Sequence, residues 1–169
     1  MSYSPVTGEK NLRNTTLMLK TPPQAKVIVC AINDSAGEAH GRPKAYGAFT
    51  FNHFLSNVAV ELQGKQGKAY PGDCLIHASD HPQEYHGEDN TWDSDWCVFD
   101  GSGIQLLINA LGLPIDQIFR PASTHFVAPL LEKIVLEHDR KANRWEMIVS
   151  LGLQELLIKL SRHCLDERT

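Results

Sequence analysis

Between residues 25 and 100, this 169-residue chain carries a series of short apolar stretches separated by turn residues. β-Branched and aromatic residues dominate these stretches, and several of them alternate between apolar and polar positions, which is typical of strands. We expect strands over residues 25–33, 46–55, 58–62, 68–70, 74–77 and 92–100. The polar segments 33–43 and 79–87 are predicted to be loops, the second of them a loop or an irregular edge. Many short strands at close spacing indicate a β-sandwich or a small barrel.

After Gly101-Ser102-Gly103, the spacing of the apolar residues changes from every second position, as in a strand, to every third or fourth position, as in a helix. A short helix is predicted over residues 104–111, and a second helix, capped by Ser123 or Thr124, over the segment that carries Leu130 to His138. A third helix, capped by Asn143, has apolar residues at helical spacing over about five turns. These residues are Trp145, Ile148, Val149, Gly152, Leu153, Leu156, Leu157 and Leu160. A short polar link between the last two helices predicts an antiparallel hairpin.

Composition places the chain among ordinary globular domains, with 42% hydrophobic and 21% charged residues. No apolar run approaches the length of a membrane span, and the N-terminal residues lack the apolar core of a secretory signal, so we expect a cytoplasmic protein with no membrane partner. The four scattered cysteines are interpreted as buried thiols. Residues 69–119 contain no Lys or Arg but nine of the 20 acids, and this acidic stretch argues against direct binding of nucleic acid.

Four segments, taken in order and spacing, carry a resemblance to a known family. They are residues 41–46 (GRPKAY), 71–76 (PGDCLI), 96–101 (WCVFDG) and 113–121 with the helical hairpin that follows. In these segments the chain resembles the N-terminal sensor domain of AraC-type transcription regulators. The resemblance implies a mainly β fold with C-terminal helices: a cupin-like, jelly-roll β-barrel followed by an α-helical hairpin.

The implied organisation has three parts. Residues 1–22 form an N-terminal arm, residues 23–101 form the effector-binding barrel, and residues 102–169 form a helical dimerisation region. In the family a helix-turn-helix DNA-binding domain follows, and this chain stops about where the linker to it would begin. We therefore expect a homodimer that contacts DNA only through that absent domain.

Candidate ligand-binding residues come from the resemblance and from strand alternation. Arg42 matches a position that contacts the effector in sugar-responsive members, and Tyr85 and Trp96 match aromatic positions that line the family's pocket. The alternative is a surface arginine and two aromatic residues of the core. Three more residues, Phe51, His53 and His77, are predicted to line the barrel. The effector class implied is a carbohydrate or another small polar metabolite. Ser94 stands where arabinose-binding members carry a polar ring, so the resemblance does not extend to arabinose itself.

A metal-dependent cupin enzyme, such as a dioxygenase or an isomerase, is the alternative. Enzymatic cupins hold a metal with a His-x-His pair, a Glu and a later His, and a first-row metal needs three or four convergent ligands. Here the residue two after His53 is Leu55, while Glu61, His77 and His81 remain as candidate ligands. No nucleophile motif and no phosphate-binding glycine loop are present in the sequence. We expect no enzymatic activity, no cofactor and no metal.

The stripe on the third helix is predicted to form the dimer interface, because the family dimerises through this hairpin by an isologous contact. The residues assigned to it are Trp145, Val149, Gly152, Leu153, Leu156 and Leu160. The alternative is that the whole stripe packs inside the chain.

Overall fold

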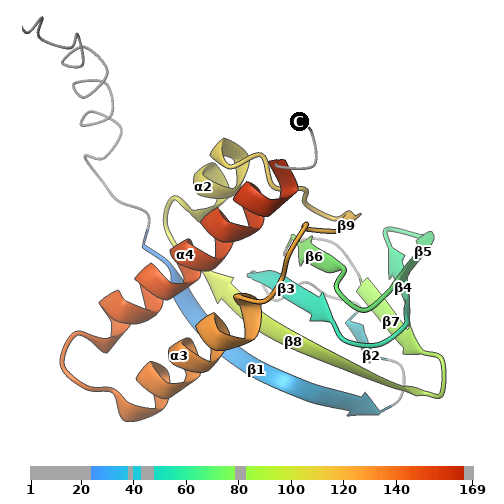
Figure 1. Cartoon of the computed structure of the whole chain (residues 1–169), viewed down its shortest axis with the longest axis horizontal. Helices are drawn as coiled ribbons and strands as arrows, with labels where there is room; N and C mark the ends of the chain where they lie inside the picture. The colour runs from blue at the N-terminus through green and yellow to red at the C-terminus, as the bar shows by residue number, and fades with distance from the viewer. Residues whose placement is uncertain (1–23, 38–39, 43–47, 79–82, 166–169) are drawn as a thin grey trace, which may run out of the picture.

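The computed structural model of the chain describes residues 24–37, 40–42, 48–78 and 83–165, which are drawn in colour in Figure 1. The predicted arm over residues 1–22 lies outside the described residues.

Within the described residues, nine strands form two antiparallel sheets. The strands are β1 (Lys26–Gly37), β2 (His40–Arg42), β3 (Phe49–Phe54), β4 (Val58–Leu62), β5 (Lys65–Ala69), β6 (Cys74–His77), β7 (Gln83–Gly87), β8 (Thr91–Asp100) and β9 (Ile118–Phe119). One sheet has the order β1-β8-β3-β6-β9, and the other has the order β2-β7-β4-β5.

The strand pairing is nested: β1 pairs with β8, β2 with β7, β3 with β6 and β4 with β5. A long antiparallel ribbon that rolls up into two facing sheets produces this order, which is that of a jelly roll. The predicted fold class, a cupin-like β-barrel followed by helices, is confirmed.

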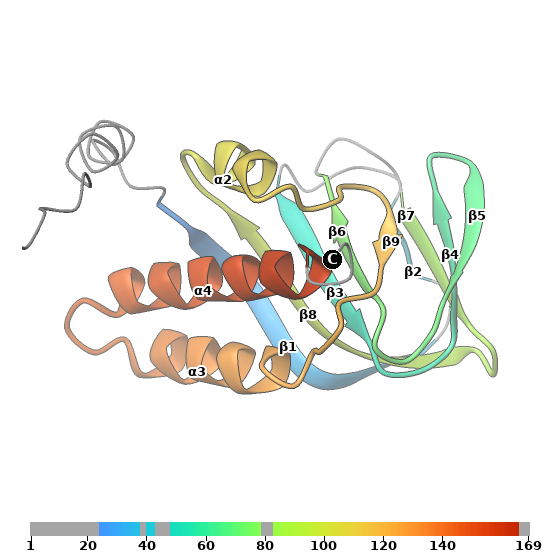
Figure 2. The same cartoon turned by 45° about the horizontal axis from the view of Figure 1, so that its top comes forward.

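The described residues also contain three helices: α2 (Ile104–Ala110), which lies between β8 and β9, and α3 (Val127–Arg140) and α4 (Trp145–Leu165), which follow β9. Helices α3 and α4 form the predicted antiparallel hairpin, which lies across the outer face of the sheet that contains β1 and β8 (Figures 1 and 2). The predicted side-chain cap of α3 is wrong, because the N-cap residue is Phe126 and no side chain caps the helix.

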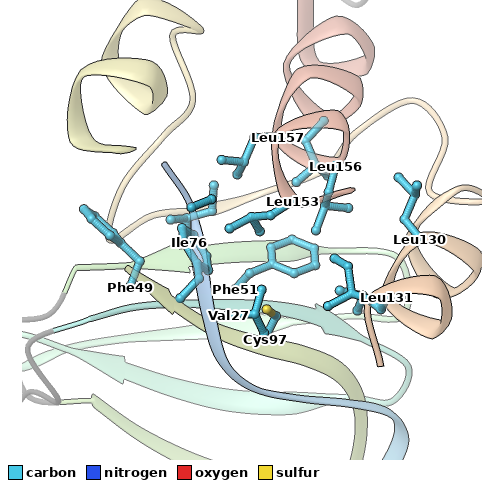
Figure 3. Close-up of a cluster of buried hydrophobic side chains, with 14 of the residues drawn as sticks. Val27, Phe49, Phe51, Ile76, Cys97, Leu130, Leu131, Leu153, Leu156 and Leu157 are labelled. Atoms are coloured by element: carbon cyan, nitrogen blue, oxygen red, sulfur yellow. The ribbon is translucent and has the colours of Figure 1, made fainter. Parts of the chain in front are cut away.

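The main hydrophobic core lies between the five-stranded sheet and the helical hairpin. Figure 3 shows Phe51 beneath Leu153 and Leu156, and all three side chains are fully buried. Gly152 brings α4 close to α3, because a Cβ at this position would lie 3.1 Å from Cγ1 of Ile134.

This core corrects the prediction for the dimer interface. Five of the six assigned residues are buried inside the chain, and Trp145 is half-buried against the same core. The five are Val149, Gly152, Leu153, Leu156 and Leu160. The stripe is wide because α4 packs on both the sheet and α3, so these side chains offer no surface to a partner.

Two segments predicted as loops contain strands. β1 continues to Gly37 and β2 follows it, and β7 occupies most of the polar segment before Gly87. In β7 the buried Gln83 and Tyr85 alternate with the exposed Glu84 and His86, so its inward face is polar. A strand whose inward face is polar shows no alternation of apolar and polar residues, so hydrophobic periodicity does not detect it.

Candidate functional site

A cavity of about 190 Å³ opens between the two sheets, on the side of the five-stranded sheet away from the helices. Strands β1, β3, β7 and β8 supply its lining. The lining residues are Asp34, Ser35, Ala36, Thr50, Asn52, Gln83, Tyr85, Trp92, Ser94 and Trp96. The volume equals that of roughly six water molecules in the liquid, so the cavity suits a ligand with a single small ring.

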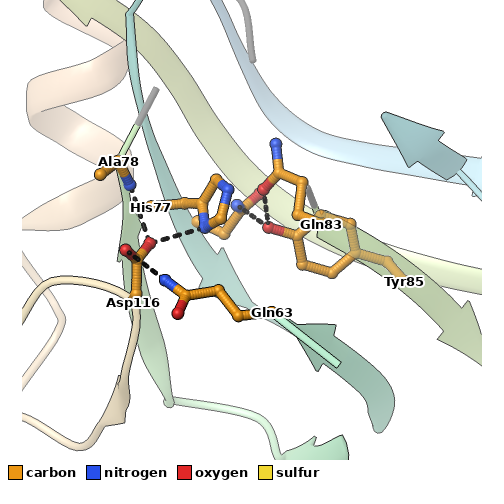
Figure 4. A network of polar contacts seen from close by, with 7 residues as sticks. Gln63, His77, Ala78, Gln83, Tyr85 and Asp116 are labelled. Atoms are coloured by element: carbon orange, nitrogen blue, oxygen red, sulfur yellow. Dashed lines mark hydrogen bonds and ion pairs between the residues drawn. The ribbon is translucent and has the colours of Figure 1, made fainter. Parts of the chain in front are cut away.

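A buried chain of hydrogen bonds forms one wall of the cavity. The hydroxyl of Tyr85 donates to Oε1 of Gln83 and accepts from Nδ2 of Asn52, at 3.2 Å for the second bond. Figure 4 shows Gln83 beside the phenol of Tyr85. All three side chains are at least nine-tenths buried, so the low local dielectric strengthens and orients these bonds. The polar groups are thus fixed before any ligand arrives.

Aromatic rings form a second wall. Tyr85 and Trp92 are stacked with centroids 5.2 Å apart, and Phe54 packs at a tilt against both rings. The indole Nε1 of Trp92 is buried and donates no hydrogen bond within the described part of the chain. A buried donor without an acceptor costs about 1–3 kcal/mol, so an acceptor on a ligand or on water would be favourable here.

Trp96 and Asp34 lie at the exposed side of the cavity. Nε1 of Trp96 donates to Oδ2 of Asp34 at 2.8 Å. The indole is half-buried and the carboxylate is exposed. A flat aromatic face beside a carboxylate acceptor suits a ligand with a C–H face and hydroxyl groups.

His77 lies near the cavity, but it is not among the residues that line it. Nδ1 of His77 lies 2.8 Å from Oδ1 of Asp116, and the same carboxylate accepts from the backbone N–H of Ala78 and from Gln63. Figure 4 shows the imidazole between Asp116 and the Gln83–Tyr85 pair. The network therefore ties β6 to the segment before β9.

The predictions for Phe51 and His53 are wrong. In the register of β3, Thr50, Asn52 and Phe54 face the cavity side, while Phe51 and His53 face the helices. Nδ1 of His53 lies 2.9 Å from Oδ2 of Asp95, and both side chains are buried. Both faces of β3 are covered, so alternation alone did not distinguish them.

Tyr85 and Trp96 are brought together in the cavity lining, as predicted, although whether they bind a ligand stays a prediction. Arg42 lies in β2 opposite Gln83 in the register, and its side chain falls outside what the structure describes. His81 lies outside the described residues altogether.

The candidate metal ligands that the structure describes do not converge. His53 faces the helices, whereas Glu61 is paired with the exposed Glu84 on the outer face of β4, opposite the buried Val60. In the described ranges, no three His, Cys, Asp or Glu side chains are placed to hold a metal ion together.

The cysteines are free thiols, of which Cys74 and Cys97 are buried and Cys30 and Cys164 are half-buried. A hydrogen bond with Cys30 and burial raise the pKa of the Cys97 thiol well above its ordinary value, and burial does the same for the pKa of Cys74. Both stay protonated near neutral pH, so neither is suited to act as a nucleophile or a metal ligand.

Most of the lining, including Asp34, Asn52, Gln83 and Trp92, was not predicted from the sequence. Trp92 could have been found, since it lies four residues before Trp96 on the same strand and so faces the same side. Asp34 could not, because a bulge in β1 changes the face on which it lies.

Comparison with solved structures finds cupin-type proteins. The AraC-like transcriptional activator CuxR is 12% identical, with a TM-score of 0.46, and the match covers 82% of this chain and 52% of that chain. A Cupin_2 domain of an XRE family transcriptional regulator from Enterobacter cloacae is 13% identical, covering 44% of this chain and 92% of its own, with a TM-score of 0.32. KdgF from Halomonas sp. is 11% identical, covering 52% and 86%, with a TM-score of 0.33.

No protein-family model and no curated protein matches the chain. No helix in the described part of the chain is both long and apolar enough to cross a membrane. The nested strand order and the cavity between the two sheets identify the chain as a jelly-roll domain that carries a C-terminal helical hairpin.

Proposed function

We propose that this chain is the sensor module of an AraC-type transcription regulator and binds a small polar effector, a sugar or a similar metabolite, in the jelly-roll cavity. The observation that carries the proposal is the cavity itself, in which the hydrogen-bonded side chains of Asn52, Gln83 and Tyr85 lie beside the aromatic rings of Trp92 and Trp96. Such a site orients hydroxyl groups and stacks against the C–H face of a ring.

Regulation would act through a DNA-binding domain supplied outside these 169 residues. An effector that binds one arrangement of the module better than another shifts the balance between them, and such couplings are typically about 1–3 kcal/mol. A metal-dependent enzyme is not favoured, because the described candidate ligands lie on different faces of the sheets.

A thermal-shift screen against neutral sugars, sugar acids and small metabolites tests the proposal. A ligand at a hundred times its dissociation constant adds about 2.7 kcal/mol to the free energy of unfolding, which shifts Tm by several degrees. Divalent metals with and without a chelator run in parallel. If only a metal stabilised the protein, and the chelator removed this effect, a metal-dependent enzyme would be favoured over the sensor module.

Trp96→Ala is expected to weaken binding of any stabilising compound at least about tenfold, because it removes the exposed aromatic face and the donor to Asp34. Isothermal titration calorimetry measures the loss. Trp145→Ala is the matched control, since Trp145 lies on α4 and packs edge-on against His138. Equal affinity of Trp96→Ala and the wild type would exclude this cavity as the binding site.

We also propose that the module forms a homodimer, through a different face of α4 from the one predicted. Met147 and Leu151 are each 63% exposed, and Ile158 is 44% exposed. Their spacing of four and seven residues places them along one side of the helix, away from the buried stripe. A second copy of the chain could cover this side by an isologous contact.

Leu151→Arg is expected to weaken dimerisation at least about thirtyfold, because it places a charge at the centre of this apolar side. Analytical ultracentrifugation measures the monomer–dimer equilibrium. Leu106→Arg is the matched control, because Leu106 is 74% exposed on α2, outside the hairpin. A dimer of unchanged strength in Leu151→Arg would place the interface elsewhere.

A further inference from the structure

An irregularity in β1 decides which residue of that strand enters the cavity. Ala31 lies opposite Trp96 and Asp34 lies opposite Ser94, so Ile32 and Asn33 together oppose Asp95. Two residues against one is a β-bulge, and here Asn33 has the positive φ of 47°. Without the extra residue, alternation would turn Asn33 rather than Asp34 to the face that Ala31 occupies.

A buried hydrogen-bonded pair, His53 and Asp95, lies on the other side of the sheet and holds this bulge. Oδ1 of Asp95 accepts the backbone N–H of Asn33 at 2.8 Å, and Oδ2 lies 2.9 Å from Nδ1 of His53. Asp95 is 2% exposed and His53 is 7% exposed. One carboxylate therefore joins His53 of β3 to the bulged backbone of β1, and the position of Asp34 follows from that contact.

The carboxylate of Asp34 brings a negative charge to the described lining of the cavity. It is the single charged group among the described lining residues, and the others are hydroxyls, amides, aromatic rings and a methyl group. One of its oxygens accepts from Trp96, and a carboxylate has about four acceptor positions in all, so capacity remains for the hydroxyls of a ligand. A ligand carboxylate in the same cavity would meet a like charge.

Resting on the proposed function, we propose that Asp34 is the residue that determines effector specificity, and that the effector is an uncharged polyhydroxylated ring rather than a sugar acid. Asp34 accepts hydrogen bonds from the hydroxyls of such a ring. The same carboxylate disfavours an anion by at least about tenfold, the repulsion expected between two charges a few ångströms apart near a protein surface.

The test pairs each neutral sugar with the acid of the same skeleton. D-galactose and D-galacturonate, D-glucose and D-glucuronate, and D-mannose and D-mannuronate are titrated calorimetrically into the wild type, Asp34→Asn and Asp93→Asn. Asp93 is the matched control, because it lies on β8, carries the same charge and bonds Ser35, yet does not line the cavity.

We expect the wild type to bind at least one neutral sugar about tenfold or more tightly than its acid. In Asp34→Asn the neutral sugar should bind more weakly and the difference between the pair should shrink to about threefold or less, because the charge is gone while an acceptor remains. In Asp93→Asn the difference should stay as in the wild type.

Two outcomes would overturn the inference, and they are distinct. Acids that bind as tightly as the neutral sugars, or tighter, would contradict the role of Asp34 while leaving a sugar-binding sensor in place. No binding of any of the six compounds would contradict the sugar-binding part of the proposed function, and this inference with it.

Discussion

A Phe51→Ala variant should lose about 3–5 kcal/mol of its free energy of unfolding, because truncating a buried phenylalanine removes apolar contacts and leaves a cavity. Phe51 is fully buried between the five-stranded sheet and α4, where Leu153 and Leu156 cover it (Figure 3). The measurement is urea-induced unfolding, in which the midpoint should fall while the slope stays constant.

The same variant separates a core role from a binding role. Phe51 faces the helices and not the cavity. At a temperature where Phe51→Ala is folded, the affinity of this variant for a ligand that stabilises the wild type should therefore differ from the wild-type affinity by no more than about twofold. Phe54→Ala is the matched comparison, because Phe54 packs against Tyr85 and Trp92 behind the cavity wall. It should lower both stability and affinity. If Phe51→Ala lost ligand affinity while Phe54→Ala kept it, Phe51 would support the cavity after all.

A His53→Leu variant is expected to lose a comparable amount, about 3–5 kcal/mol, for an electrostatic reason. Removing one partner of a buried polar pair leaves the other out of contact with water and without its side-chain hydrogen bond. Asp95 would keep the N–H of Asn33 but lose its side-chain partner. Because Asp95 also holds the bulge in β1, we expect the same variant to weaken binding of neutral ligands through Asp34.

A conservative change at the same position distinguishes the hydrogen bond from simple packing. His53→Asn keeps a side-chain N–H that can donate to Asp95 in place of Nδ1, so it should recover part of the stability and of the ligand affinity. Chemical denaturation and calorimetry on both variants provide the comparison. Equal losses in His53→Leu and His53→Asn would mean that the imidazole acts by its shape and not by its bond to Asp95.

The strands near the cavity show how far sequence pattern reaches. The pattern located β3, β4, β6 and β8 because each is an apolar stretch bounded by turn residues. It could not decide which face of β3 points inward, because helices cover one face and the second sheet covers the other. Phe51 and Thr50 are therefore both buried, and only the register with β6 and β8 assigns one to the core and the other to the cavity.

The site itself was predictable where the resemblance supplied positions and unpredictable where the backbone is irregular. Tyr85 and Trp96 were predicted from matching motifs, and both line the cavity. Asp34 reaches it through a bulge whose backbone is bonded to the carboxylate of Asp95, more than sixty residues away in sequence. The stripe on α4 has the period of a helix with a buried side, and the period is the same whether a partner or the chain's own sheet covers that side.

The three indole N–H groups of this chain offer the most direct test of ligand binding in the jelly-roll cavity. Trp92 and Trp96 line it, while Trp145 lies on α4. In ¹⁵N-labelled protein titrated with each compound that raises Tm, we predict that the Trp92 and Trp96 indole resonances shift with the same dissociation constant and that Trp145 does not move. A stabilising compound that shifts Trp145 alone, or none of the three, would contradict binding in this cavity.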